Sequence, residues 1–288
     1  LATAIYYLGI PLGVGIGFLI ASILGPIFGW RNIFISLGII GVIIGLLIYF
    51  MTEPERGAYD KKSNQHDEQK KISQIIKLAF KSIANIRSLW LIMLGGIIGH
   101  IPLGVGGFDA VWAVQERGFK EDEYAAIFGI LFVVGGSIGA IFGGLMGDYF
   151  ASRYKGGAML SLIIVYMFLI PASIYYRFAS PDSIYFYIAL FLITFQVTVF
   201  YGPVFSAVQS LCPYKVRTSI LAIWILGVNI VGMGIGSFFT GYLSDTVFSN
   251  FKEPLSWSTS LMAAFTFLSL ICYHLSRKTY EEDVKKAQ

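Results

Sequence analysis

The chain has 288 residues, of which 56% are hydrophobic and 13% are charged, and its formal net charge is +4. A soluble globular domain carries about 25% charged residues, so this chain has about half the usual charge. Apolar stretches of about 20 residues recur along the sequence, which is the length needed to cross a bilayer. The composition therefore excludes a soluble globular domain and predicts an all-α, polytopic membrane protein.

The residues that build metal and catalytic sites are scarce and scattered. Cys212 and Cys272 are the only cysteines and there are three histidines, a pattern that predicts neither a disulfide framework nor a metal site. The glycine-rich stretches 13–18 and 232–237 lie inside apolar segments and lack dinucleotide-binding spacing, and no Walker loop is present. We therefore expect no enzyme activity, no cofactor, no metal and no nucleic-acid partner.

Hydropathy and charge predict eight membrane-spanning helices. The chain begins LATAIYY, without an initiator methionine or a signal-peptide basic region, and so reads as starting within a longer protein. A polar stretch follows the second span, and its part ISQIIKLAFKSIANI (72–86) has apolar residues at helical spacing, which predicts an amphipathic helix on the membrane surface. The segment Glu281–Lys286 is expected to be a solvated tail without function. The predicted spans are 2–29, 32–52, 88–114, 124–149, 157–177, 183–211, 217–244 and 255–276.

Lysine and arginine are divided unevenly between the two sets of alternate loops. Sixteen lie in the loops after the second, fourth, sixth and eighth spans, and five lie in the other set. Loops rich in lysine and arginine stay in the cytoplasm. The first span is therefore expected to run outward, and the C-terminus is expected to be cytoplasmic.

Two predicted spans carry small residues at every fourth position, on one helix face. The first has Gly9, Gly13, Gly17, Ala21, Gly25 and Gly29, and the fourth has Gly135, Gly139, Gly143 and Gly147. Small residues on one face allow two helix backbones to approach closely in lipid. The ladders indicate either ordinary helix packing or smooth surfaces on which helices slide during a transport cycle.

The fourth span ends in the charged stretch GGLMGDYFASRYKGG. Asp148 lies at the C-terminal end of the predicted helix, where the helix dipole disfavours a negative charge, so it needs a compensating partner. The stretch resembles the loop motif of the major facilitator superfamily. Gly144 and Asp148 match the first part of the motif, and Arg153 and Lys155 match the second. The basic residue that often follows the aspartate directly is replaced here by Tyr149. The resemblance implies a charge network that latches one conformation. The alternative is a turn whose bases only hold the loop in the cytoplasm.

A second stretch, GPIFGWRNIF (25–34), resembles the end of the fifth and the start of the sixth helix of that family. The resemblance implies a helical bundle in which this chain covers helices five to twelve of twelve. It assigns 1–52 to the last two helices of the N-terminal bundle, 53–87 to a cytoplasmic central loop with an amphipathic helix, 88–276 to the C-terminal six-helix bundle and 277–288 to a cytoplasmic tail.

Two further stretches, TEPERG (52–57) and 217–245, look like the Spinster-like transporters of the superfamily. The organic anion:cation symporters share parts of both. Spinster-like members are associated with export of lysophospholipids or sphingoid lipids. The resemblance therefore implies a small organic or amphipathic solute, lysolipid-like or an organic anion.

Ionisable side chains within a span are functional candidates, because removing them from water is costly. Asp109 lies in the outer part of the third span and is expected either to bind a proton or cation, or to pair with Arg117 or Arg31 at the rim. His100 lies near mid-membrane and either titrates near neutral pH or is a neutral hydrogen-bonded residue. At 100° per residue, nine positions place these two side chains on opposite helix faces.

Uncharged polar residues in the spans also need partners. Gln196 and Asn229 either bond between helices or line a central path together with Tyr201 and Trp112. Taken with the resemblance, these residues predict a monomeric secondary transporter in the plasma or inner membrane that works by alternating access and is driven by a proton or cation gradient. The alternatives are a receptor or scaffold of the same fold and an inactive transporter fragment.

Overall fold

The computed structural model describes residues 2–52 and 72–287, and the regular structure in these ranges is helical, without strands. In the first part of the chain the elements are α1 (Ala2–Tyr7), α2 (Gly9–Tyr49), α3 (Ile72–Asn85), α4 (Arg87–Gly99), the 3₁₀ turn η1 (Pro102–Val105), α5 (Gly106–Arg117) and α6 (Glu121–Arg153). The remaining elements are α7 (Gly157–Phe178), α8 (Ile184–Val199), α9 (Tyr201–Leu211), η2 (Tyr214–Val216), α10 (Arg217–Gly227), η3 (Val228–Met233), α11 (Gly234–Tyr242), η4 (Leu243–Val247), α12 (Pro254–Ala264), α13 (Thr266–Arg277) and α14 (Tyr280–Ala287).

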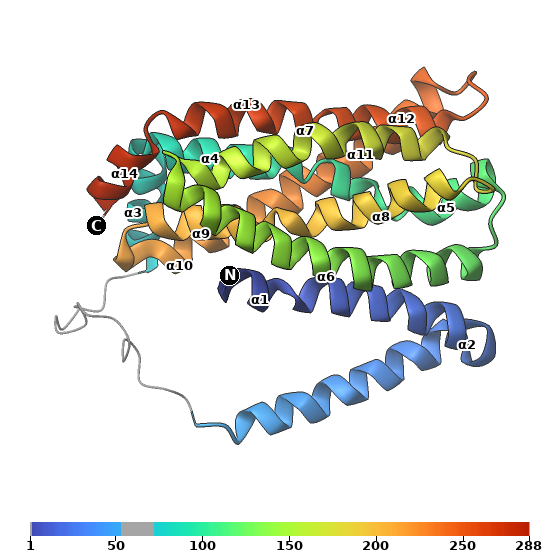
Figure 1. The fold of residues 1–288 in the computed structure, drawn as a ribbon. Helices are drawn as coiled ribbons and strands as arrows, with labels where there is room; N and C mark the ends of the chain where they lie inside the picture. The colour runs from blue at the N-terminus through green and yellow to red at the C-terminus, as the bar shows by residue number, and fades with distance from the viewer. Residues whose placement is uncertain (1, 53–71, 288) are drawn as a thin grey trace.

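Seven helices in the described ranges are long and apolar enough to cross a membrane, and the first of them is folded back on itself. This helix, Ile5–Tyr49, has 45 residues, about twice what a bilayer requires. At Gly29 the backbone has φ 72° and ψ 154°, a conformation open to glycine, and the chain reverses direction there (Figure 1). The two arms correspond to the first two predicted spans. The prediction of an all-α polytopic membrane protein is confirmed.

Four of the other spans are built from consecutive helical pieces. The span Arg87–Arg117 passes from α4 through η1 into α5, and Ile184–Leu211 is divided at Phe200. The span Tyr214–Val247 contains the π-helical turns η3 and η4, and Pro254–Arg277 is divided at Phe265. Irregular backbone is tolerated in a membrane only where it is buried in protein or lines a cavity.

The glycine ladder of α6 packs closely on α8. A Cβ atom added at Gly135 would overlap the hydroxyl of Thr194, and one added at Gly139 or Gly143 would overlap the backbone carbonyl of α8. Thr198 Oγ1 donates a hydrogen bond of 2.6 Å to the carbonyl of Gly136 across the same interface. These glycines therefore set the separation of the two helices.

The ladder of the first span is placed differently. Cβ atoms added at Gly13, Gly17 and Gly25 would meet nothing within 4 Å in the described part of the chain. The close approach to α6 is made instead by Gly15, where an added Cβ would lie 2.8 Å from the carbonyl oxygen of Gly129. The small residues at every fourth position of the first span therefore do not form a tight interface within the described part of the chain. The spacing of small residues shows that they share one helix face, but it does not show which helix packs on that face.

The C-terminal ends of α6, α9 and α13 lie at one end of the bundle (Figure 1), which we call the basic end because the turns that follow these helices carry lysine and arginine. It includes Arg153, Lys155, Lys215 and Arg277. The expected amphipathic helix is present there as α3, which packs Ile75 and Ile83 on the bundle. Its residues Ile72, Ile76 and Phe80 form an exposed apolar stripe on another face. The Arg56 and Lys61 loop lies outside the described residues.

The C-terminal segment is not the solvated tail expected from its charge. It forms α14, which packs Tyr280 and Val284 against the main core. Asp283 is buried, and its Oδ2 accepts hydrogen bonds of 2.8 Å from both the backbone N–H and the hydroxyl of Ser88. Asp283 thereby caps the N-terminus of α4 from 195 residues away. Burial raises the pKa of this carboxyl, but the hydrogen bonds from Ser88 and Thr279 and the charge of Lys286 together outweigh it and hold the pKa below its ordinary value.

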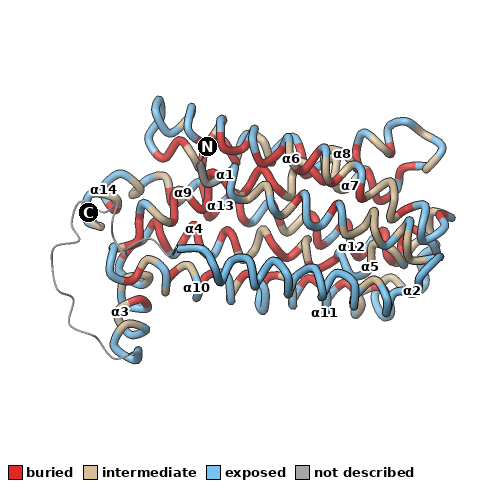
Figure 2. The backbone as a smooth tube through the Cα atoms, turned by 90° about the horizontal axis from the view of Figure 1, so that it is seen from below, coloured by how far each residue is buried: buried red, intermediate tan, exposed pale blue. Residues whose placement is uncertain are grey.

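Large apolar side chains remain exposed on several helices of the described structure. The second arm of α2 is exposed along almost its whole length in the described structure (Figure 2). On the other side of the bundle, α7 exposes Met167 and Phe168, and α13 exposes Leu268 and Ile271. In a membrane protein such surfaces are the ones that face lipid or further helices.

The α6–α8 interface predicts a difference between two glycine substitutions. Gly139→Ala should lower the melting temperature of the detergent-purified protein, because the added methyl group overlaps the α8 backbone and overpacking costs about 1–3 kcal/mol. Gly17→Ala should leave it unchanged, because the methyl group enters open space. Equal melting temperatures would contradict the described packing.

The cap on α4 predicts that Asp283→Ala releases α14. Loss of such a cap costs about 0.5–2 kcal/mol, so amide hydrogen exchange in α14 and at Ser88 should accelerate. Because the folded-state pKa is lowered, this contribution is complete above the ordinary carboxyl pKa and is lost as the pH falls through the folded value. Glu282→Ala, on the exposed face of α14, is the matched control and should leave exchange unchanged.

Candidate functional site

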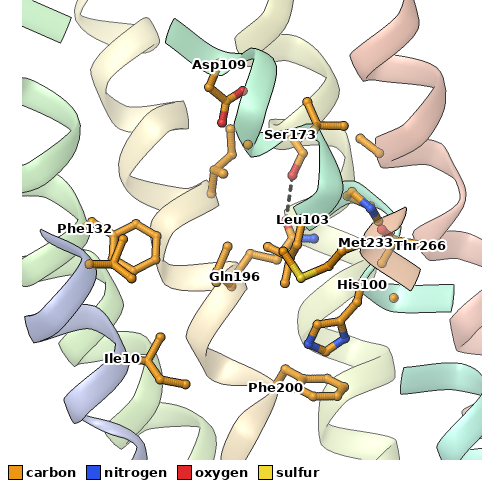
Figure 3. Close-up of a pocket in the computed structure, with 18 of the residues that line it drawn as sticks. Ile10, His100, Leu103, Asp109, Phe132, Ser173, Gln196, Phe200, Met233 and Thr266 are labelled. Carbon is orange, nitrogen blue, oxygen red and sulfur yellow. Dashed lines mark hydrogen bonds between the residues drawn. The ribbon is translucent and has the colours of Figure 1, made fainter. Parts of the chain in front are cut away.

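A central cavity of about 670 Å³ lies within the bundle, and all seven spans contribute to its wall (Figure 3). Most of the lining is apolar or aromatic. The polar and ionisable residues of the wall are His100, Asp109, Ser173, Arg177, Gln196, Asn229, Thr259 and Thr266. An enclosed apolar space with a few polar groups is the usual form of a small-molecule site.

The helix breaks surround this cavity. Leu103 of η1, Phe200 at the α8–α9 break and Met233 of η3 all line it, as does Thr266 directly after the break at Phe265. Figure 3 shows these side chains from four different spans around one space. In each of the four spans, one helix break therefore lies at the cavity wall.

His100 is buried at the C-terminal end of α4, beside the cavity. Its Nδ1 lies 2.7 Å from the carbonyl oxygen of Gly96. A carbonyl can only accept, so a neutral imidazole carries its proton on Nδ1 and leaves Nε2 as an acceptor. The ring stands edge-on to Phe200, with centroids 4.8 Å apart. This arrangement fixes the ring while keeping one nitrogen able to accept a proton or a hydrogen bond.

Asp109 lines the same cavity as His100, contrary to the expectation that they face different surroundings. The expectation assumed a continuous α-helix. Instead α4 ends at Gly99, and the 3₁₀ turn η1 lies between the two residues. A 3₁₀ turn advances by about 120° per residue rather than 100°. The angle calculated between these two side chains for a continuous α-helix is therefore wrong.

The ionic partner of Asp109 is Arg177, and not Arg117 or Arg31 as expected. Asp109 Oδ1 lies 2.7 Å from Arg177 Nη1. Arg177 is 9% exposed, and its guanidinium lies 4.7 Å from the ring centroid of Trp112. Arg31 lies instead over the ring of Trp30. The pair forms the charged end of the cavity. It joins α5 to the C-terminal end of α7, at the end of the bundle opposite the basic end (Figure 1).

A polar network behind this pair joins the ends of α5, α7 and α12. Arg117 bonds both carboxylate oxygens of Glu253, at 3.1 and 2.9 Å, and also donates to the carbonyl of Arg177. Glu116 accepts from the backbone N–H groups of Leu255 and Ser256, at 2.7 and 2.9 Å, and so caps the N-terminus of α12. The hydrogen bond from Arg117 holds the pKa of Glu253 below its ordinary value.

Trp112 does not line the central path as expected. It is fully buried, packs in an aromatic cluster with Tyr176 and Phe186, and donates from Nε1 to Ser256 Oγ at 2.9 Å. Its ring carries the guanidinium of Arg177 on its face. Trp112 therefore supports the charged end of the cavity from behind.

The other expected residues do line the cavity. Gln196 Oε1 accepts a hydrogen bond of 2.7 Å from Ser173 (Figure 3). Asn229 lies in η3 and bonds the carbonyl of Ile225 at 2.8 Å. Tyr201 stacks on Tyr7, with ring centroids 5.0 Å apart. This stack joins α1 to α9 at the part of the cavity wall nearest the basic end.

The charged motif lies at the end of α6, away from the central cavity. The helix continues to Arg153, so Asp148 is exposed more than one turn before its end and not at its terminus. Gly144 is buried and faces Gly202 of α9, where an added Cβ would lie 3.0 Å from Gly144 Cα. Arg153 stacks on the ring of Tyr149 at 4.2 Å. The predicted latch role of Asp148 and Lys155 stays a prediction.

Sequence reasoning missed Arg177, Glu116, Glu253 and Ser256. Each was placed at or beyond the end of a predicted span, where charged residues are ordinarily solvated. The sequence indicates these residues only weakly. Arg177 lies in the last turn of one predicted span, and Glu116 and Glu253 lie next to the ends of two others. Only the three-dimensional arrangement brings them to one place.

Comparison with known proteins finds a matching family model, a distant relative and solved structures of similar fold. The family model described as Major Facilitator Superfamily matches residues 1–223. A protein of Mycolicibacterium smegmatis (strain ATCC 700084 / mc(2)155) described as an MFS-type efflux pump is 21% identical over 292 residues, which cover 98% of this chain and 64% of that protein. The chain thus spans less than two thirds of the length of this relative.

Two solved structures have a similar fold. Both are of a bacterial homolog to the human lysosomal transporter Spinster in an inward-facing conformation. The unoccupied form is 20% identical, with a TM-score of 0.67 over 94% of this chain and 66% of that one. The occupied form is 18% identical, with a TM-score of 0.68 over 97% of this chain and 70% of that one.

The buried Asp109–Arg177 pair predicts non-additive effects of substitution on stability. Asp109→Asn or Arg177→Gln alone should destabilise the protein, because each change leaves one charge of this largely buried pair without its partner. The double variant should recover much of this loss, since no uncompensated charge remains. Thermal unfolding of the three variants in detergent measures the coupling, and additive losses would contradict a direct ion pair.

Proposed function

We propose that this chain, which belongs to the Major Facilitator Superfamily, moves an amphipathic organic solute through its central cavity by alternating access. The observation that carries the proposal is the cavity itself: an apolar and aromatic space with an ion pair at one end and a histidine in its wall. Two similar proteins, one described as an efflux pump and the other as a homolog of the Spinster transporter, support it.

The chemistry of the wall favours an anionic amphipath. Aromatic and aliphatic side chains such as Phe128, Phe132 and Val14 would hold the apolar part. Arg177 would hold the anionic group, since a guanidinium binds carboxylates and phosphates through paired hydrogen bonds. In the described structure Asp109 occupies this position. The solute and Asp109 would therefore compete for one cation.

This competition gives a physical route to proton coupling. When Asp109 takes up a proton it loses its charge, and Arg177 is then free to bind the solute anion. When the solute leaves, Arg177 pairs again with the Asp109 carboxylate, as in the described structure, and the proton is released. His100, whose Nε2 can accept a proton, is the second candidate for the coupling group. A lysolipid-like molecule and a long-chain organic anion both fit this scheme.

The proposed orientation follows from the basic end. We propose that the basic end and the C-terminus lie in the cytoplasm, because loops rich in lysine and arginine stay on that side. The charged end of the cavity then lies toward the outer side. We propose further that the Gly144, Asp148, Arg153 and Lys155 motif stabilises one conformation of the cycle from the cytoplasmic side.

Transport in liposomes tests the proposal. Purified protein is reconstituted with a pH-sensitive dye inside, and a lysophospholipid, a long-chain organic anion or an uncharged amphipath of similar length is added outside. An anionic amphipath should cause proton movement, and the uncharged one should not. Absence of solute-dependent proton movement with all three would contradict the proposal and favour a non-transporting receptor or scaffold.

The Arg177→Gln variant tests the site. It should reduce apparent affinity for the anion by about tenfold or more, because a hydrogen bond to a charged group contributes about 1.5–3 kcal/mol. Arg117→Gln is the matched control: it removes the same charge at the same end, but Arg117 does not line the cavity. Equal loss in both variants would show a structural effect only and would contradict the assigned role of Arg177.

A further inference from the structure

A second cavity, of about 570 Å³, lies at the basic end, far from the central one in the fold. One wall is the end of α6 and the turn that follows it, and the other is the corner between α13 and α14. We call it the corner pocket. It is lined by Ala151, Ser152, Arg153, Tyr154, Lys155, Arg277, Lys278, Glu281, Glu282 and Lys285.

The corner pocket carries an excess of positive charge. Five of its side chains are basic and two are acidic. One of the two acids, Glu281, is hydrogen-bonded within the protein: its Oε1 accepts a bond of 3.3 Å from the backbone N–H of Gly156. Arg277 Nε is buried and has no hydrogen-bond partner within the described ranges. The pocket thus offers several donors and cations to an anionic acceptor.

The two walls are held together by a close backbone contact. Gly156 has φ +58°, and a Cβ added there would lie 2.9 Å from the Cβ of Arg277. The guanidinium of Arg277 reaches back to the carbonyl of Lys155 at 3.4 Å. The docking of α14 on α4 through Asp283 fixes the far side of the corner. The Arg277 guanidinium and the two walls are therefore positioned before any ligand binds, which lowers the entropy cost of binding.

The location points to a ligand with an apolar part. Helix α7 begins at Gly157, directly after the turn, and α13 ends at Arg277. Both helices expose large apolar side chains, among them Phe168 and Ile271. Tyr154 in the pocket wall is half exposed, and tyrosines are enriched where a protein crosses the headgroup region. An apolar flank thus leads into a basic pocket at the membrane boundary.

We propose that the corner pocket binds the phosphate headgroup of an anionic glycerophospholipid from the adjoining leaflet, with the acyl chains along α7 and α13. Basic pockets between helices on the cytoplasmic side recognise such headgroups through charge-assisted hydrogen bonds. The proposal is independent of the central cavity and of the solute that it transports.

Native mass spectrometry of the detergent-solubilised protein tests this, by titration with phosphatidylglycerol or with zwitterionic phosphatidylcholine. Phosphatidylglycerol should be retained and phosphatidylcholine should not. In the double variant Lys155→Gln with Lys278→Gln, affinity for phosphatidylglycerol should fall about 30-fold, since each basic residue near an anionic surface contributes roughly fivefold. Unaltered helical content and elution volume establish that the variant is folded.

The matched control removes two charges at the same end but outside the pocket, as Lys77→Gln with Lys81→Gln on α3. It should retain the parental affinity. An equal loss in this control would show general electrostatic attraction and overturn the proposal. Displacement of the lipid by inorganic phosphate at the same concentration would also overturn it, because it would show a site for soluble phosphates. None of these outcomes depends on transport activity.

Discussion

The structure depends on one constraint: inside a bilayer every backbone N–H and C=O must find a partner within the protein. Continuous helices meet this requirement at once, and α6 and α7 are uninterrupted along their lengths. Four other spans depart from it at η1, Phe200, η3 and Phe265, and these four breaks lie around the central cavity, whereas the reversal at Gly29 and the π-helical turn η4 lie away from it. Local 3₁₀ and π geometry often occurs at functional sites. Here it turns side chains such as His100 and Asp109, which a straight helix would separate, toward one space.

The same constraint governs the charges. Asp109 and Arg177 can be buried together because each compensates the other and because Trp112 supports the guanidinium with its ring face. Such a pair contributes little net stability compared with apolar residues of similar size, but breaking it is costly. Such an ion pair has two states: in one the two side chains bind each other, and in the other they bind different partners. That property suits a transporter, whose solute and coupling ion must both bias one equilibrium.

Much of the fold could be predicted from the sequence, because the length and hydropathy of the spans are local properties. The amphipathic helix α3 and the reversal near Gly29 belong to this part. The shared cavity of His100 and Asp109 could not be predicted, because the 3₁₀ turn between them changes the angle between their side chains. The pairing of Asp109 with Arg177 could not be predicted either, because it joins two helices that are far apart in the sequence. Asp283 was misjudged for a similar reason: a charged C-terminal segment is usually solvated, and only the fold brings it to Ser88. The glycines of α2 show that regular spacing identifies one face of a helix but does not show which helix packs against that face.

The central claim is that Arg177 exchanges Asp109 for the anionic group of a solute. A structure determined with a bound anionic amphipath tests this most directly. We predict the anionic group within hydrogen-bond distance of the Arg177 guanidinium, the apolar part among the aromatic side chains of the central cavity, and the carboxylate of Asp109 displaced from its present 2.7 Å contact. A solute bound outside this cavity, or one bound inside it with the Asp109–Arg177 pair intact, would contradict the account.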